Sequence, residues 1–540
     1  IGSFVANKAH DLEATLEGKL PIDAVFSGFE ALKPYWARFP GDSDWKLGLA
    51  IGSTTPAVPT PIVLTAESDL VGTALHLPAP LDKPADAALP TKLSMSLPAE
   101  DSTLTLALGD VAQLRAHLPG MQPLSLALNF GVEAPATTPV DGLVVGGTAD
   151  ALDLSGWAAF GAGSDSGGLR LRGIDVSAQH SHIFEREFGR LDLRMMPGLD
   201  ATEIVLAGDA AQGRLHIPAR DLELRGITAE FAKLYLPAPP PDEPDDAAGA
   251  LAGVAPASIP PLHLRVDDFR LGEAKFGAAR LESAPGAQGM RISQLEATSP
   301  NMQMRATGDW TGDAASSRSN FAIDLSSNNL GRMLDTLGYA GVVDGGKTLA
   351  QIQASWLGTP SSFALAKLNG ALKISVAEGR ILDVEPGVGR LFGLLSIREI
   401  PRRLALDFGD FFRSGMTFKS ISGDFDLRDG DAITQNLHIA SPSADIRVSG
   451  RTGLKARDYD QQMIVVPRVG GALPVVGAIA GGPVGAAAGL AVQTLFNRAI
   501  NSVTTARYHV TGSWENPVIT LVSREDGRKP ADSKSLPAQE

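Results

Sequence analysis

Alternation of apolar and polar residues with a period of two is the feature that most constrains the fold of this chain. The segment Thr103–Leu108 reads Thr-Leu-Thr-Leu-Ala-Leu, and the same period recurs along most of the sequence. Residues i and i+2 share one face of a β-strand, so each such segment has one apolar face and one polar face. The apolar positions that we expect to share a face are Leu126, Leu128, Phe130, Leu264, Val266, Ile323, Leu325, Ile374, Val376, Phe425, Leu427, Ile446 and Val448.

Turn sequences separate these segments, as in Leu108-Gly109-Asp110 and Arg428-Asp429-Gly430-Asp431. Clean alternation is typical of antiparallel strands with one solvated face, rather than of a parallel sheet covered by helices. Gly and Pro supply 58 and 37 of the 540 residues, which disfavours long uninterrupted helices. The sequence therefore predicts an all-β fold dominated by antiparallel strands.

A chain with this many one-faced strands must bury their apolar sides. Two arrangements satisfy this need. Sheets can stack face to face as sandwiches, or one long twisted sheet can curl into an open groove lined with Leu, Ile, Val, Phe and Met. An open apolar groove needs an occupant, and lipid acyl chains would supply one at about 0.8 kcal/mol per buried CH₂. Composition does not choose between the two arrangements.

Composition and motifs exclude several classes of function. A net charge of −14 argues against nucleic-acid binding, and the absence of cysteine excludes thiol catalysis and disulfides. The pair His180-x-His182 has no third ligand at a sensible spacing, so we predict no metal site. Gly387-x-Gly389 lacks the spacing and the βαβ context of a dinucleotide site. No catalytic triad or carboxylate pair stands out, and we predict neither an enzyme nor a cofactor.

Two segments depart from the strand pattern. Residues 386–401 carry a helical apolar stripe of Val388, Leu391, Phe392 and Leu395, accompanied by Arg390, Arg398, Arg402 and Arg403. Residues 469–500 begin with a stretch that has no charged residue up to Arg498 and is rich in Gly and Ala. This stretch is long enough to cross a bilayer, but its glycines and prolines favour a bent apolar helix or a helical hairpin.

Composition also suggests boundaries. Residues 236–261 are Pro-rich and acidic, and we expect a solvated loop there. Residues 524–540 are charged and lack aromatic side chains, and we expect a disordered tail. The predicted strand regions are then residues 1–235 and 262–523. The sequence starts at Ile1 without a methionine, which suggests a fragment of a longer protein.

A resemblance to a known family favours the open groove over stacked sandwiches. The motif Gly379-Arg380-Ile381-Leu382-Asp383-Val384-Glu385-Pro386-Gly387-Val388-Gly389-Arg390-Leu391-Phe392-Gly393 resembles the C-terminal module of AsmA-like proteins. Gly423-Asp424-Phe425-x-Leu427-Arg428-Asp429-Gly430 and Tyr508-x-Val510-Thr511-Gly512-Ser513-Trp514 are similar to that module as well. The resemblance is strong over residues 355–522 and weaker upstream, where Leu77-Pro78-Ala79-Pro80-Leu81 also matches.

This resemblance implies a long β-sheet groove without catalytic residues. Such proteins are bridge-like lipid transporters of Gram-negative bacteria, anchored in the inner membrane by an N-terminal helix and crossing the periplasm. The groove would hold phospholipid acyl chains and move phospholipids towards the outer membrane, supporting its permeability barrier. The apolar positions named above would line the groove. From their own character, the stripe and arginines of residues 386–403 and the apolar residues 469–500 suit contact with the outer membrane at the C-terminal end. The alternative is that both segments only cap the open end of the sheet and protect its edge strand.

Two other classes of function remain open from the sequence. One is a structural or adhesive envelope protein made of stacked sandwiches that bind no lipid. The other is an assembly factor that handles outer-membrane protein precursors along an exposed sheet edge. Neither the lipid headgroup nor the protein partners follow from the sequence.

Overall fold

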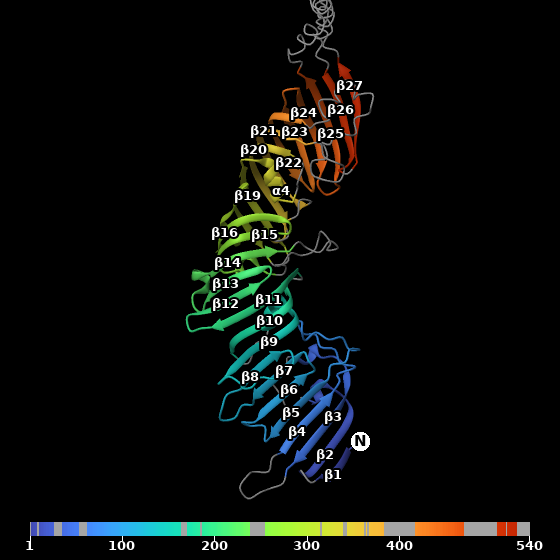
Figure 1. Ribbon diagram of the computed structural model, residues 1–540, viewed down its shortest axis with the longest axis vertical. Helices are drawn as coiled ribbons and strands as arrows, with labels where there is room; N and C mark the ends of the chain where they lie inside the picture. Colours follow the sequence, from blue (N-terminus) through green and yellow to red (C-terminus); the bar gives the residue numbers. More distant parts are fainter. Residues whose placement is uncertain are drawn as a thin grey trace, which may run out of the picture. The chain divides into compact units, whose positions relative to one another are not determined.

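The structure is a computed structural model that describes residues 2–7, 10–25, 35–52, 62–163, 170–183, 186–237, 254–313, 316–338, 343–360, 363, 367–382, 416–468, 505–514 and 516–525. The chain divides into two compact units. The N-terminal unit comprises Ile1–Asp242 and Pro261–Gly272, and the C-terminal unit comprises Glu243–Pro260 and Glu273–Glu540. Strands dominate both units, and the described helices are few and short (Figure 1).

The strands of the N-terminal unit are β1 (Gly2–Asn7), β2 (His10–Pro21), β3 (Asp42–Ile51), β4 (Ile62–Ser68), β5 (Thr91–Leu97), β6 (Thr103–Leu108), β7 (Ala112–His117), β8 (Ser125–Phe130), β9 (Gly142–Asp153), β10 (Leu171–Ile183), β11 (Arg186–Pro197), β12 (Ala201–Gly208), β13 (Ala211–Pro218), β14 (Ile227–Leu236) and β15 (Leu262–Leu271). Its helices are α1 (Ile22–Val25), α2 (Leu154–Gly163) and α3 (Leu222–Arg225).

The strands of the C-terminal unit are β16 (Ala274–Gly286), β17 (Gly289–Ser299), β18 (Met302–Gly312), β19 (Ser317–Ser327), β20 (Val343–Leu357), β21 (Asn369–Ile381), β22 (Met416–Arg428), β23 (Asp431–Ala440), β24 (Ala444–Gly453), β25 (Asp458–Pro467), β26 (Thr505–Ser513) and β27 (Pro517–Glu525). Its helices are α4 (Leu330–Thr336) and the 3₁₀ turn η2 (Pro256–Ser258).

The strands belong to one 27-stranded sheet, which confirms the predicted all-β class and the long open sheet. Within each unit every strand pairs with the next strand along the chain. Most of these pairs are antiparallel, as the alternation predicts, and the hairpin turns after Leu108 and Arg428 lie where the sequence places them.

Three pairs depart from the antiparallel expectation: β8 with β9, β9 with β10, and β14 with β15 are parallel. A parallel neighbour requires the chain to return to the end where the previous strand began. The segment that contains α2 connects β9 to β10, and the chain between Leu236 and Leu262 connects β14 to β15. Alternation within a strand carries no information about such returns, which is why the sequence missed them.

Several predictions fall outside the described residues. These are the helix expected at 386–401 with Arg402 and Arg403 beyond it, the apolar segment at 469–500, most of the loop at 236–261, and nearly all of the tail at 524–540. Among the helices that the structure describes, none has the length and hydropathy needed to cross a membrane.

Candidate functional site

The residues that pair across the N-terminal unit form an unbroken apolar row. One residue from each of the strands β2 to β15 contributes, and each pairs with the next by backbone register. The N-terminal apolar row consists of Leu16, Leu47, Ala66, Leu93, Leu106, Leu114, Leu128, Val145, Ile174, Met195, Ile204, Leu215, Ala229 and Leu264. Paired residues share a face, so these side chains all lie on one side of the sheet.

The C-terminal unit has an equivalent row from β16 to β22. The C-terminal apolar row consists of Leu281, Leu295, Ala306, Ile323, Ile352, Leu372 and Phe425. A second row lies two residues along the strands and contains Met304, Leu325, Ala350 and Ile374. Apolar side chains therefore cover several neighbouring positions on this face.

Both rows remain partly exposed although nearly all their members are large apolar side chains. From Leu106 to Leu264 every member of the N-terminal row is only half-buried, and so are Ile323, Ile352, Leu372 and Phe425 in the C-terminal row. Two apolar residues beside the rows are buried: Val266 and Val376 are each 1% exposed. The centre of each apolar face is thus accessible, while its flanks are packed.

In the N-terminal unit the chain itself covers one margin of the apolar face. The segment between β4 and β5 lies there, and its residues Leu75 and Leu81 are buried. Trp157 of α2 donates from Nε1 to the carbonyl oxygen of Ala79 at 2.8 Å, and its ring lies 6.1 Å from that of Phe130. These contacts build a wall beside the half-buried row.

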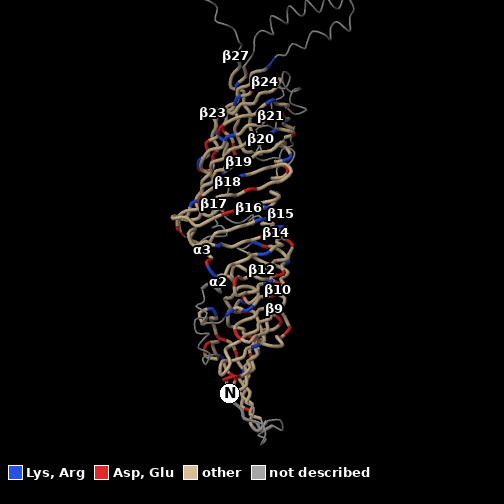
Figure 2. Tube along the Cα trace, turned by 90° about the vertical axis from the view of Figure 1, so that its left-hand side faces the viewer, with Lys and Arg blue, Asp and Glu red and all other residues tan. Residues whose placement is uncertain are grey.

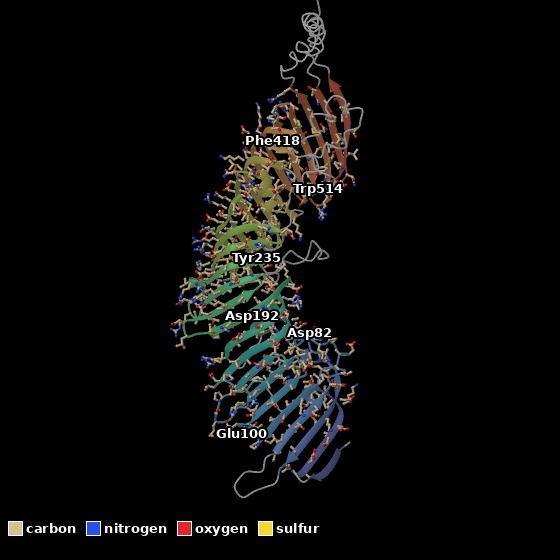
Figure 3. The ribbon with its side chains drawn as sticks, in the orientation of Figure 1. Asp82, Glu100, Asp192, Tyr235, Phe418 and Trp514 are labelled. Atoms are coloured by element: carbon tan, nitrogen blue, oxygen red, sulfur yellow. The ribbon has the colours of Figure 1, made fainter. Side chains whose placement is uncertain are left out.

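In the C-terminal unit, α4 forms a wall of this kind beside the apolar face. The side chain of Asn329 caps this helix by accepting from the backbone N–H of Arg332 at 3.0 Å. Leu330, Met333 and Leu334 are buried against Val376, Ile381, Phe418 and Ile446 in one cluster. A second cluster contains Trp310, Trp356 and Leu368 and receives Val254 and Ile259, which flank η2. Figure 3 labels Phe418 in the C-terminal unit.

The opposite face of the sheet carries charge. Asp175, Arg194, Val205, Arg214, Glu230 and Arg265 follow one another in register across β10 to β15. Arg194 contacts Asp175 at 3.0 Å and Arg214 contacts Glu230 at 2.9 Å. The C-terminal unit has a similar cross-strand ion pair, in which Arg305 contacts Glu296 at 3.5 Å. Figure 2 shows cationic and anionic residues interspersed along the chain.

The predicted groove residues differ in where they lie relative to the apolar rows and in how exposed they are. Leu128, Leu264, Ile323 and Phe425 belong to the apolar rows, and Leu325 and Ile374 belong to the second row. Leu126 is half-buried, and the others are nearly or fully enclosed: Phe130, Val266, Val376, Leu427, Ile446 and Val448. The predicted membrane-contact residues, Val388, Arg390, Leu391, Phe392, Leu395, Arg398, Arg402 and Arg403, lie outside the described residues.

No group of three or more His, Asp or Glu side chains within the described ranges could hold a metal ion. His180 instead contacts Glu187 across the β10–β11 hairpin at 2.7 Å. This hydrogen bond raises the pKa of His180. The sequence analysis missed this carboxylate because its proximity depends on the hairpin pairing rather than on spacing.

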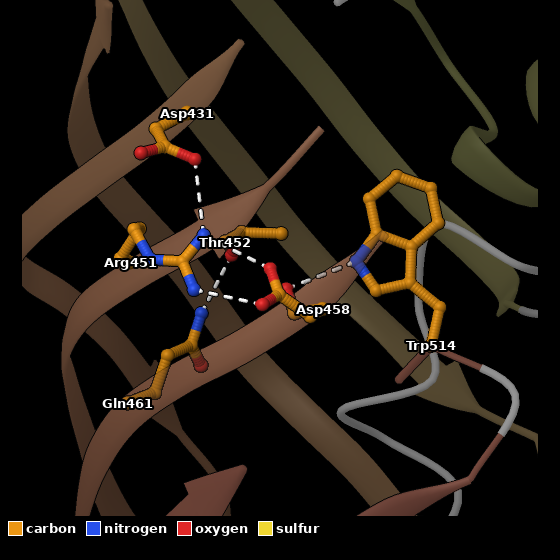
Figure 4. Close-up of polar contacts among 6 residues, drawn as sticks. All are labelled: Asp431, Arg451, Thr452, Asp458, Gln461 and Trp514. Atoms are coloured by element: carbon orange, nitrogen blue, oxygen red, sulfur yellow. Dashed lines mark hydrogen bonds and ion pairs between the residues drawn. The ribbon is translucent and has the colours of Figure 1, made fainter. Parts of the chain in front are cut away.

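The sequence analysis also missed a polar cluster at one end of the strands β23 to β27 (Figure 4). Arg451 contacts both Asp431 and Asp458, and Trp514 donates from Nε1 to the carbonyl oxygen of Asp458 at 3.3 Å. Gln461 donates from Nε2 to Oγ1 of Thr452 at 2.6 Å.

Comparison with known proteins identifies the family. The family described as YhdP protein matches residues 2–519, which is nearly the whole chain. The chain belongs to the YhdP family. The intermembrane phospholipid transporter YhdP of Escherichia coli (strain K12) is 26% identical over 230 residues. That alignment covers 42% of this chain and 18% of the relative, so the chain matches a small part of that protein's length.

No solved structure matches this member of the YhdP family. The resemblance to AsmA-like proteins noted in the sequence is confirmed at the level of the YhdP family. The fold itself therefore rests on the strand pairings described above.

Proposed function

We propose that this chain is part of a bridge-like transporter that carries phospholipids between the two membranes of a Gram-negative envelope. In this proposal the acyl chains lie along the two apolar rows, and the chain occupies the periplasm. An N-terminal anchor in the inner membrane and delivery to the outer membrane at the C-terminal end belong to the same proposal. The support for it is family membership together with the name of the Escherichia coli relative.

The observation that carries the proposal is the N-terminal apolar row. A stable sheet normally buries its apolar face completely. Here a row of Leu, Ile, Val, Met and one Ala stays half-buried from β6 to β15, while the chain packs along its margin. Such a surface favours an apolar occupant, and each CH₂ group removed from water gains about 0.8 kcal/mol. An adhesive protein would have no need for the accessible row.

The test is photo-crosslinking at adjacent residues. A photoreactive amino acid at Leu264 lies on the apolar row, and one at Arg265 lies on the charged face of the same strand. Ile323 and Asp324 form the matched pair in the C-terminal unit. After expression in a Gram-negative host, we expect lipid adducts at Leu264 and Ile323 and none above background at Arg265 and Asp324. Equal capture at both members of a pair would contradict the proposal.

A further inference from the structure

The C-terminal apolar row changes character after β22. In register, Phe425 pairs with Thr434, Thr434 with Gly450, and Gly450 with Gln461. The row thus passes from large apolar side chains to a threonine, a glycine and a glutamine. Thr434 and Gln461 are each 1% exposed. We call Thr434, Thr452 and Gln461 the polar step.

Half of the Gln461 amide has no partner. Its Nε2 donates to Thr452 Oγ1 at 2.6 Å, but its Oε1 is buried without a hydrogen bond among the described residues. In Figure 4 the amide nitrogen faces Thr452 and the oxygen is turned away from it. A buried acceptor left unpaired costs more than an ordinary hydrogen bond contributes, so such groups are rare and call for an explanation.

Among the residues that the structure describes, none donates a hydrogen bond to this oxygen. Tyr459, Val510 and Trp514 pack together in an apolar cluster beside Gln461, which pairs with Val510 across β25 and β26. The guanidinium of Arg451 is committed to the carboxylates of Asp431 and Asp458 at 2.9–3.0 Å. A molecule that the protein binds would supply the missing donor.

We infer that Gln461 Oε1 accepts a hydrogen bond from the polar part of a lipid, so that the polar step favours lipids whose headgroup carries an N–H or O–H donor. This inference rests on the proposed function and adds a specificity to it. Acyl chains have no donor, and neither does a trimethylated ammonium, whereas a primary ammonium or a hydroxyl does. Because Val510 and Gln461 are each 1% exposed, the side chains around the step must shift to admit the headgroup.

The experiment compares a lipid whose primary ammonium carries N–H donors with one whose trimethylated ammonium carries none. The purified chain is incubated with vesicles containing equal amounts of an ethanolamine and a choline phospholipid with identical acyl chains. Bound lipid is then extracted and quantified by mass spectrometry. We expect the ethanolamine lipid to be enriched about five- to tenfold, which corresponds to one hydrogen bond to a buried acceptor.

The variants isolate Gln461. Gln461→Met keeps the shape of the side chain and removes its acceptor, and we expect the enrichment to vanish while the total lipid bound stays the same. Gln462→Met is the matched control, because Gln462 is exposed on the other face of the same strand, and it should retain the enrichment. Circular dichroism melts check folding, and Gln461→Leu replaces the first variant if that one unfolds.

The outcomes separate the two proposals. Loading of both lipids without enrichment overturns the inference and leaves the proposed function standing. Enrichment that persists in Gln461→Met also overturns the inference. If the unmodified chain binds neither lipid, the proposed function fails and the inference fails with it.

Discussion

Arg451 on β24 holds Asp458 at the start of β25 with two hydrogen bonds of 2.9 Å, one from each terminal nitrogen of its guanidinium. One of these nitrogens also donates to Asp431, the first residue of β23, at 3.0 Å. Arg451 therefore ties the turn between β22 and β23 to the turn between β24 and β25. Backbone hydrogen bonds from Leu454 and Lys455 to the carbonyl oxygen of Gly430 join the same two turns.

The first prediction concerns the free energy of unfolding of the C-terminal unit. Asp458→Asn should lower it by about 1 kcal/mol, because the pair is charge-assisted but about one-third exposed. Arg451→Met should lower the free energy of unfolding at least as much, because it leaves two carboxylates without their partner. A double-mutant cycle measured by denaturant unfolding gives the coupling energy. A coupling of zero would contradict a stabilising role for this pair.

The second prediction concerns pH. The hydrogen bond from Arg451 is the main cause that lowers the pKa of Asp458. A carboxyl whose pKa is lower in the folded state adds stability above its unfolded pKa and loses it as pH falls through the folded pKa. The difference in melting temperature between the unmodified chain and Asp458→Asn should be constant near neutral pH and shrink below about pH 4. A difference that grows as the pH falls below 4 would contradict this linkage.

The third prediction concerns passage of lipid along the apolar face. Ile374 is half-buried, and its register partners are Ala350 and Gly423. Ile374→Asp places a carboxylate against the buried apolar cluster of the C-terminal unit, so we expect lipid binding to fall at least tenfold. Ser375→Asp is the control, because Ser375 is exposed on the opposite face. Lipid extracted from both purified variants gives the measurement, and normal loading of Ile374→Asp would count against a continuous path.

The fourth prediction concerns the wall formed by α4. Met333 is 5% exposed and packs in the cluster that contains Val376 and Phe418. Met333→Ala removes most of that contact and should lower the free energy of unfolding by about 2–4 kcal/mol. Arg332→Ala, at the exposed neighbouring position, should change it by less than about 0.5 kcal/mol. Similar losses in the two variants would show that α4 does not pack as described.

The fifth prediction concerns the uncharged stretch that follows Arg468. Its composition suits shallow insertion at a membrane surface. If residues 469–496 dock on a membrane, their deletion should leave the melting temperature unchanged and abolish flotation with liposomes. If they only protect the sheet, the deletion variant should aggregate or melt early, while its soluble fraction floats with liposomes like the parent.

The sequence by itself determined which face of each strand is apolar. Leu264 and Arg265 illustrate this, because a period of two places them on opposite sides, and the structure puts one in the apolar row and the other beside Glu230. The same reasoning placed Ile323 and Phe425 on a common face. Side-chain direction in a strand follows from the backbone alone, so this part of the fold is local and readable.

Only the tertiary structure decided which apolar residues meet across strands. The pairing of β22 with β23 shifts between Ser422 and Phe425, which brings Thr434 opposite Phe425. The pairing of β23 with β24 shifts between Thr434 and Leu437, so that Gly450 lies opposite Thr434. A slip of one residue would have turned the opposite face of the strand towards the row. Register, parallel returns and the walls built by α2 and α4 depend on contacts between distant segments. No periodicity within one strand encodes those contacts, which is why the polar step at Gln461 emerged from the structure and not from the sequence.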